Sequence, residues 1–241
     1  MHDEKPKAPA GVGIDGCSHG WLAVIVDQEG NAHSRCEPDL GFLSDLLPVR
    51  VLIDMPIGLP SAQAPARLCD QRARKLLGKG ATSRVFSQPI REVLEVENYI
   101  DLCQKSRALT GKAISKQSFN ILPKIRELDR LLRLQQQMQQ YILESHPEVC
   151  FTQLAGETLP PKKTFLGLEA RLRCLEKRWE NARMRFESIR EVHPRLSQVA
   201  DDDILDAMVL AWVAAKTTTA TLPENPPFDD CGLPMQIVFP V

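Results

Sequence analysis

Apolar positions in the first sixty residues fall into short runs that are typical of β-strands. Residues 11–15 and 21–26 are two such runs separated by the turn-rich pentapeptide GCSHG, which predicts a β-hairpin. Residues 32–36 predict a third strand, and residues 49–55 (VRVLIDM) predict a fourth, buried one. Between these two, residues 40–47 have helical spacing and end before a proline. The chain should therefore open as an α/β protein does.

From about residue 61 to residue 140 the pattern changes to helices. Residues 141–151 (YILESHPEVCF) are apolar at both ends, which predicts a strand whose end or bulge carries the His-Pro-Glu sequence. Helices are expected over about 166–186 and 201–215. The closing GLPMQIVFPV predicts an edge strand.

Composition narrows the class of protein. Hydrophobic residues make up 43% and charged residues 25%, which is ordinary for a soluble globular protein. The longest apolar run, 207–215, is far shorter than the ~20 residues that a membrane span needs. The start of the chain lacks the apolar segment of a signal peptide, and the seven cysteines contain no C-x-x-C pair. We therefore expect reduced thiols and a cytoplasmic location.

Residues 1–10 should form a disordered tail, and residues 11–241 a single domain with a helical basic insertion at about 61–140. A net charge of −1 hides an asymmetry, because residues 67–91 hold seven basic groups and one acid, and residues 105–133 hold eight basic groups and two acids. These groups form either solvated helix faces or a surface for polyanions. The candidates for contact with nucleic acid are Arg72, Arg74, Lys75, Arg84 and Lys124, and those for phosphate or partner contact also include Ser83, Gln117 and Lys163.

Two acids stand at strand ends. Asp15 precedes Gly16 at the end of the first apolar run, and Asp54 lies near the end of the fourth. Such strand ends are where α/β folds usually place their chemistry, and a buried acid there needs a cation or a hydrogen-bond donor. Each is alternatively a turn-forming aspartate. Their occurrence on two strands of one unit favours a site.

A third group of acids lies in the sequence DDDILDAMVLAW at 201–212. Asp203 and Asp206 are three residues apart, and Asp202 and Asp206 are four apart, so they share one flank of an apolar helical stripe. Asp201 and Asp202 alternatively cap the helix, and either Asp202 or Asp203 joins Asp206 as a ligand. Clustered carboxylates beside a core need a cation, and hard oxygen donors imply Mg²⁺ or Mn²⁺.

The ordered motifs GIDGC…GW, LIDMPIGLP, R-x-x-x-R-x-L-L-G…RVF, HPE and DDxLDA cover about residues 11–240. Together they resemble domain-of-unknown-function family 429, described as predicted nucleases of the ribonuclease H-like fold. The resemblance implies a mixed five-stranded sheet with antiparallel first strands, flanked by helices, with the helical insertion after the fourth strand. By analogy with Holliday-junction resolvases of that superfamily, it implies Asp15, Asp54, Asp203 and Asp206 as catalytic metal ligands.

Two residues of the HPE motif leave alternatives open. Glu148 is either an additional catalytic ligand or a structural acid at a strand end. His146 either moves a proton near neutral pH or is structural.

The function favoured by these features is a metal-dependent phosphodiesterase, a nuclease that hydrolyses DNA, RNA or a hybrid with two divalent ions ~3.5–4 Å apart. One alternative is a catalytically silent binding or scaffold protein that keeps the fold. Another is a nucleotide-dependent phosphotransferase, although GIDGCSHG is the only Gly-rich phosphate loop in the chain.

Overall fold

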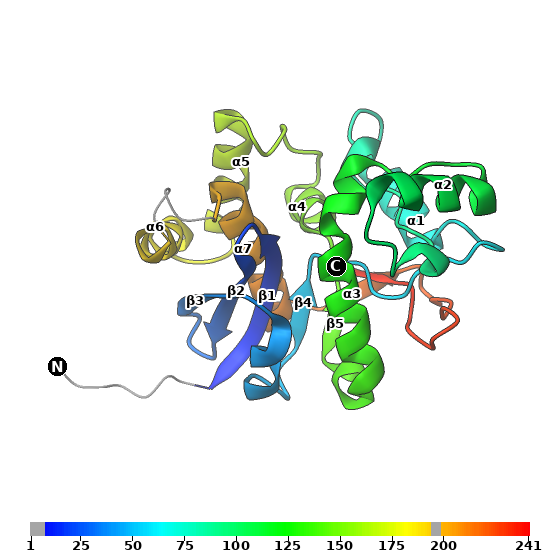
Figure 1. Cartoon of the computed structure of the whole chain (residues 1–241). Coiled ribbons are helices and arrows are strands. Elements are labelled where there is room, and N and C mark those ends of the chain that lie inside the picture. The colour runs from blue at the N-terminus through cyan, green and yellow to red at the C-terminus, as the bar shows by residue number, and fades with distance from the viewer. Residues whose placement is uncertain (1–7, 194–198) are drawn as a thin grey trace.

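The computed structural model describes residues 8–193 and 199–241, so most of the expected N-terminal tail lies outside the described residues. A mixed five-stranded sheet in the order β3-β2-β1-β4-β5 forms the centre of the molecule (Figure 1). Its strands are β1 (Pro9–Cys17), β2 (Gly20–Asp27), β3 (Ala32–Glu37), β4 (Val51–Ile53) and β5 (Ile142–Glu144). Because β1 already begins at Pro9, the expected tail is too long at its inner end.

The predicted hairpin is confirmed. Strands β1 and β2 are antiparallel with Cys17 opposite Gly20, and β3 extends the sheet antiparallel to β2. Strand β4 runs parallel to β1, and β5 runs parallel to β4. The segment predicted as a helix over 40–47 is a shorter 3₁₀ helix, Leu40–Asp45. The expected α/β architecture, a mixed five-stranded sheet flanked by helices, is therefore present.

The segment between β4 and β5 is helical, as the pattern predicts. Its elements are α1 (Leu68–Leu77), α2 (Tyr99–Thr110), α3 (Lys116–Leu134) and 3₁₀ helices at Thr82–Arg84, Arg91–Val93 and Gln136–Gln140. Asn98 and Ser115 accept hydrogen bonds from backbone amides in the first turns of α2 and α3 and so cap these helices.

Two predictions for the following segment are wrong. The HPE sequence does not end or bulge a strand: after β5, it begins helix α4 (Pro147–Ala155). His146 occupies the N-cap and Pro147 the first helical turn, where proline needs no amide hydrogen. The single helix expected over 166–186 is two helices, α5 (Phe165–Glu176) and α6 (Ala182–Val192). The chain leaves the helical conformation after α5, and Asn181, directly before α6, is left-handed with φ 58°.

Helix α7 (Asp201–Lys216) lies directly on β1. A Cβ added at Gly13 would stand 2.1 Å from the carbonyl oxygen of Ala207, and one at Gly11 would stand 2.4 Å from the amide nitrogen of Ala215. The absence of side chains at these two positions lets the helix approach the strand closely.

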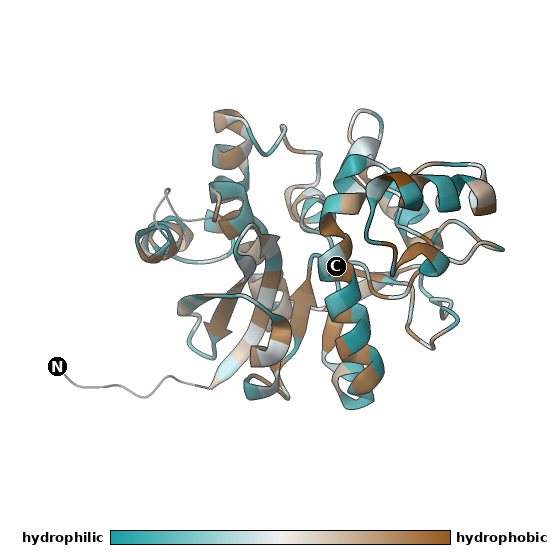
Figure 2. Cartoon of the chain, viewed as in Figure 1, coloured by the Kyte–Doolittle hydropathy of each residue, from teal (hydrophilic) through white to brown (hydrophobic). Residues whose placement is uncertain are grey.

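Two apolar cores cover the two faces of the sheet. One joins α7, α4 and α5 to residues such as Leu22 and Leu52, and the other joins α3 to residues such as Ile14 and Ile53. In Figure 2 the hydrophobic colour gathers on β2 and β4, while α3 carries both colours along its length, as expected of an amphipathic helix.

The end of the chain forms a separate two-stranded ribbon of β6 (Thr219–Leu222) and β7 (Ile237–Pro240). The predicted final strand is confirmed, whereas β6, which follows α7 after two residues, is missed. Ser145 joins the ribbon to the end of β5, because its hydroxyl donates to the carbonyl oxygen of Val238 over 2.7 Å. Among the described helices, none is both long and apolar enough to cross a membrane.

Candidate functional site

Three aspartates from three elements lie near one another on the face of the sheet that α7 covers. Asp15 lies near the end of β1, and Asp54 directly follows β4. The backbone amide of Asp54 donates to the carbonyl oxygen of Ile14 over 2.9 Å. Asp206 lies in the second turn of α7 and is 1% exposed. The close approach of α7 to Gly13 brings Asp206 over this edge of the sheet.

The carboxylates influence one another. Burial raises the pKa of Asp15 well above its usual value, and the charges of Asp54 and Asp206 raise it further. Burial likewise raises the pKa of Asp54, and it raises that of Asp206 to about 7 although Lys162 opposes the change. The raised pKa values show that ionising these buried carboxyl groups is unfavourable. A nearby positive charge would stabilise their ionised form.

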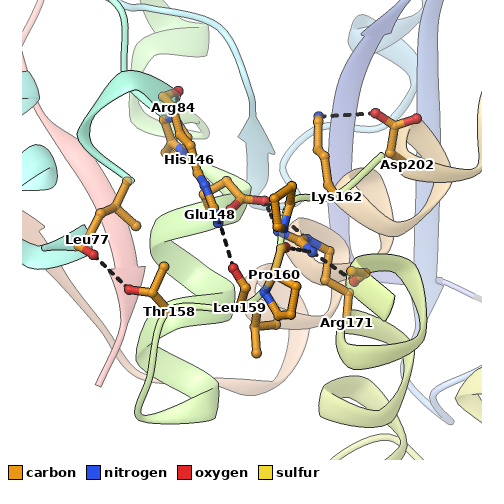
Figure 3. Close-up of polar contacts among 12 residues, drawn as sticks. Leu77, Arg84, His146, Glu148, Thr158, Leu159, Pro160, Lys162, Arg171 and Asp202 are labelled. Atoms are coloured by element: carbon orange, nitrogen blue, oxygen red, sulfur yellow. Dashed lines mark hydrogen bonds and ion pairs between the residues drawn. The ribbon is translucent and has the colours of Figure 1, made fainter. Parts of the chain in front are cut away.

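Lys162 supplies that charge. Its Nζ lies 2.5 Å from Oδ2 of Asp206 and 3.6 Å from Oδ2 of Asp202, the latter contact drawn in Figure 3. Burial alone would lower the pKa of Lys162, but Asp206 and Asp15 outweigh it and the pKa is raised. The ammonium group is therefore firmly protonated.

The acids at the start of α7 divide their roles. Asp203 accepts a hydrogen bond from the backbone amide of Ala200 over 2.9 Å and so caps the helix. Asp201 lies 2.5 Å from Arg190, and Asp202 lies beside Lys162 on the flank of Asp206. Thus Asp202, rather than Asp203, shares its cation with Asp206, while Asp203 has a capping contact that the sequence pattern assigned to its neighbours.

Glu148 lies in the first turn of α4 and not at a strand end as expected. Its carboxylate is paired with Arg84 and with Arg171, whose Nη2 lies 2.5 Å from Oε1. The same two guanidinium groups donate to the carbonyl oxygens of Leu159 and Pro160, each over 2.9 Å, as Figure 3 shows. Glu148 therefore fixes, through two arginines, the segment that leads to Lys162.

A further acid, Glu144, ends β5 on the opposite face of the sheet. Its two oxygens accept hydrogen bonds from Nη2 of Arg67 at 2.7 and 2.6 Å, and Arg67 also lies 3.7 Å from Asp70. The amide of Ile57 donates to the same carboxylate over 2.7 Å. This buried network ties the loop after β4 and the start of α1 to β5.

A cavity of about 450 Å³ opens beside the aspartates. Met55, Val85, Phe86, Ile121 and Ile237 form an apolar part of its wall. The sequence-predicted residues that line it are Asp15, Asp54, Asp206, Glu148, His146, Ser83, Arg84, Gln117, Lys124 and Lys163. The structure therefore brings most candidate residues to a single site, whereas Asp203, Arg72, Arg74 and Lys75 do not line this cavity.

The basic candidates differ in their surroundings. Arg72 and Lys75 are exposed on α1. Arg74 donates to the carbonyl oxygen of Val85 over 2.8 Å, and Nζ of Lys124 donates to that of Gly20 over 2.6 Å while lying above the ring of Trp21. Some basic side chains of the insertion, such as Arg74, Lys124 and Arg84, therefore already have partners within the protein.

The donor atoms of the site suit a hard cation, but they are not gathered around one point. Within residues 8–193 and 199–241, no three His, Cys, Asp or Glu side chains form a group that could hold a metal ion. The cluster does offer carboxylate oxygens, and Oδ1 of Asp206 is buried without a hydrogen-bond partner in this part of the chain. The residues thus fit Mg²⁺ or Mn²⁺ in donor type, and such an ion would compete with Lys162 for Asp206.

Three residues of the site are missed by sequence reasoning. Glu144 follows a short apolar run, as Asp15 and Asp54 do, so the same strand-end argument could have found it. Lys162 lies in the sequence PPKKT and Arg171 within an ordinary amphipathic helix. Nothing in the local pattern distinguishes these two cations from exposed ones, because their burial depends on distant elements.

Comparison with known proteins places the chain in a family. Neither a curated protein nor a solved structure matches it. The model of the family described as "Protein of unknown function (DUF429)" matches residues 13–227, a range that begins within β1, extends past β6 and contains all three aspartates of the cluster. The resemblance of the motifs to this family is confirmed, and the chain belongs to it.

Proposed function

We propose that the protein is a metal-dependent phosphodiesterase that acts on nucleic acid, with a ribonuclease H-like fold. The observation that carries this proposal is that Asp15, Asp54 and Asp206, from two parallel strands and one helix, line the wall of one cavity. Strand ends of this kind are the usual place for active-site groups in α/β folds.

The topology supports the same proposal. The sheet has antiparallel first strands, parallel β4 and β5, and a helical insertion after the fourth strand. These are the features that resemblance to the family implies for a ribonuclease H-like fold. Fold alone does not establish the reaction, so the proposal depends on the acids.

Asp15, Asp54 and Asp206 would hold the Mg²⁺ or Mn²⁺, with Asp202 on the flank of Asp206 as a further oxygen donor. When bound, divalent ions would supply an activated water and stabilise the leaving oxygen. Lys162 neutralises the carboxylates in the absence of other cations, and Ser83, Lys124 and Lys163 lie along the cavity wall where they can orient a phosphate. Asp203 keeps the start of α7 in place through its cap.

Exposed basic groups would hold the rest of the substrate. Arg72 and Lys75 are solvated on α1, so they can contact phosphates freely, whereas Arg74 and Arg84 already bind Val85 and Glu148. Contacts of this type are insensitive to sequence and weaken with salt, since each neutralised phosphate releases counterions. Replacing Arg72 and Lys75 with glutamine should reduce the salt dependence of binding, whereas metal affinity should not change.

The test is hydrolysis of labelled duplex DNA, RNA, hybrid and a four-way junction with Mg²⁺, Mn²⁺ or EDTA. Activity should require the divalent ion and disappear in the Asp15→Asn and Asp206→Asn variants. The exposed variant Asp45→Asn is the matched control and should retain activity. Hydrolysis that persists in EDTA, or in both site variants, would contradict the proposal.

One observation favours a second candidate, a catalytically silent binding protein of the same fold. Lys162 already neutralises Asp206, so the cluster can exist without a metal ion. Binding of the same nucleic acids in EDTA, with no hydrolysis under any ionic condition, would support this alternative.

A further inference from the structure

The cavity beside the aspartates has the size of a small-molecule site. Its volume of about 450 Å³ lies within the range of roughly 300–1,000 Å³ that is usual for pockets enclosing a single small ligand. A base pair with its two backbones would have to remain outside such a cavity. A substrate that reaches the aspartates through it must therefore present one nucleotide at a time, as a free molecule, from a chain end or turned out of a strand.

The cavity also has buried polar atoms without partners. Oε1 of Gln88, Nδ1 of His146 and Oδ1 of Asp206 belong to residues that line it, and each atom is buried without a hydrogen bond among the described residues. Nε2 of His146 lies 3.2 Å from the carbonyl oxygen of Arg84, so this nitrogen donates. In the neutral ring Nδ1 is then an acceptor.

Oδ1 of Asp206 is an oxygen of the proposed metal site. Oε1 of Gln88 and Nδ1 of the neutral His146 ring remain as acceptors for a ligand, and buried acceptors are costly unless a donor reaches them. Amino groups of a base and hydroxyl groups of a sugar are donors of the required kind. The rest of the lining matches the other parts of a nucleotide. Phe86 and Ile121 offer an apolar surface to a base, and Lys163 and Lys124 offer positive charge to a phosphate.

An extended single strand fits this lining less well. Proteins that bind long single strands stack successive bases on several aromatic side chains. Among the described residues that line the cavity, Phe86 is the only Phe, Tyr or Trp. One ring provides a platform for one base.

We propose that this cavity binds a single nucleotide, either a free nucleoside monophosphate or the terminal nucleotide of a strand, with its base against Phe86 and its phosphate toward Lys163 and the aspartates. This inference rests on the proposed function for its substrate class. It adds that the substrate enters by an end and that hydrolysis proceeds from that end.

The experiment measures binding separately from hydrolysis. The full chain is titrated calorimetrically with AMP, GMP, CMP and UMP, once in EDTA and once with Ca²⁺. In a second arm, fluorescence anisotropy compares a linear single-stranded oligonucleotide with the same sequence closed into a circle. Saturable binding of a monophosphate indicates the free nucleotide, and binding of the linear but not the circular strand indicates the chain end; either result supports the inference.

Variants connect the binding to the cavity. Phe86→Ala should weaken binding roughly tenfold through the lost stack. Gln88→Ala should weaken it on the order of fivefold and serves as the second variant if Phe86→Ala does not fold. Phe228→Ala, which removes an exposed ring outside the cavity, and Gln136→Ala, which removes an exposed amide, are the matched controls and should bind as the unaltered protein does.

The inference is overturned if no monophosphate binds and the linear strand binds no more tightly than the circle or not at all. It is also overturned if both cavity variants bind unchanged. Its failure differs from that of the proposed function. A protein that cleaves closed circles but binds no nucleotide in the cavity loses only the inference. One that binds a monophosphate without Mg²⁺-dependent hydrolysis of any nucleic acid loses only the proposed function.

Discussion

Nζ of Lys162 lies 2.5 Å from Oδ2 of Asp206, and this pair connects the loop before α5 to the second turn of α7. Asp206 is almost fully buried, whereas about a third of the Lys162 side chain is exposed. The lysine thus brings positive charge from the solvent-facing side to carboxylates that have little access to water.

Removing this cation should destabilise the protein in a pH-dependent way. In Lys162→Met, ionised Asp206 and Asp15 lose their compensating charge, which should lower the free energy of unfolding at pH 8 by about 2 kcal/mol. The expected loss is smaller than the loss on breaking a fully buried ion pair, because Lys162 is partly exposed. At pH 5, below the pKa of about 7 of Asp206, that carboxyl is largely protonated and the loss should shrink. Urea unfolding at both pH values measures the difference.

The neighbouring Lys163→Met is the control for this prediction, because Lys163 is exposed. Its free energy of unfolding should stay within about 0.5 kcal/mol of the unaltered protein at both pH values. An equal loss at pH 5 and pH 8 in Lys162→Met would show that the lysine acts by packing and not by charge.

Asp15→Asn should have the opposite effect. The folded-state pKa of Asp15 is raised above 3.8, so the folded protein binds more protons and its stability falls as pH rises through that raised pKa. Asparagine removes the charge and can still accept from the amide of Gly16, which lies 2.8 Å from Oδ1. We expect a gain of about 1–2 kcal/mol at pH 8 that disappears near pH 4.

Thermal unfolding in metal-free buffer between pH 4 and pH 8 tests this gain. Asp45→Asn, at an exposed position, should show no such trend. A marked loss of stability in Asp15→Asn at pH 8 would indicate that the carboxylate is structural.

Glu148 should matter for stability more than its place in the HPE motif suggests. In Glu148→Gln, Arg84 and the fully buried Arg171 lose the carboxylate that neutralises them, at an expected cost of about 3–5 kcal/mol. The segment of Leu159 and Pro160 should then exchange its amide hydrogens faster. Denaturant unfolding and hydrogen exchange measure both effects, and Glu157→Gln on the exposed loop is the control. Unchanged exchange with lost activity would instead make Glu148 a ligand.

Short-range patterns were sufficient for much of the fold. Alternation and turn residues located β1, β2 and β3, and helical spacing located α7 to within a residue of its end. The errors arose where one residue type is compatible with two local structures. Pro147 suits a strand bulge and also the first turn of a helix, and only the N-cap geometry of His146 decides between them. Asn181 precedes α6 in a left-handed conformation, which its neighbours do not encode.

The site was predictable as far as its acids follow the sheet. Asp15 and Asp54 end parallel neighbouring strands, so their proximity follows from topology. The basic partners do not follow in this way. Arg171 and Lys162 reach Glu148 and Asp206 from 23 and 44 residues away, and such pairs depend on how α5 and its preceding loop pack. Charge counts in the insertion likewise could not separate exposed Arg72 from internally bonded Arg74.

Competition between Lys162 and a metal ion gives the last prediction. A divalent ion at Asp206 must displace the ammonium group, so the measured metal affinity includes the cost of breaking that pair. Calorimetric titration with Mg²⁺ and Mn²⁺ should show binding to the unaltered protein and none to Asp15→Asn or Asp206→Asn.

Lys162→Met should bind the ion about tenfold more tightly, which corresponds to ~1.4 kcal/mol, and the ion should restore the stability that this variant loses at pH 8. Asp202→Asn should weaken binding more than Asp203→Asn, since Asp202 lies beside Lys162 and Asp203 caps the helix. Equal metal affinity in all six proteins would remove the metal site, and a weaker affinity in Lys162→Met would show that the lysine helps to hold the ion and does not compete with it.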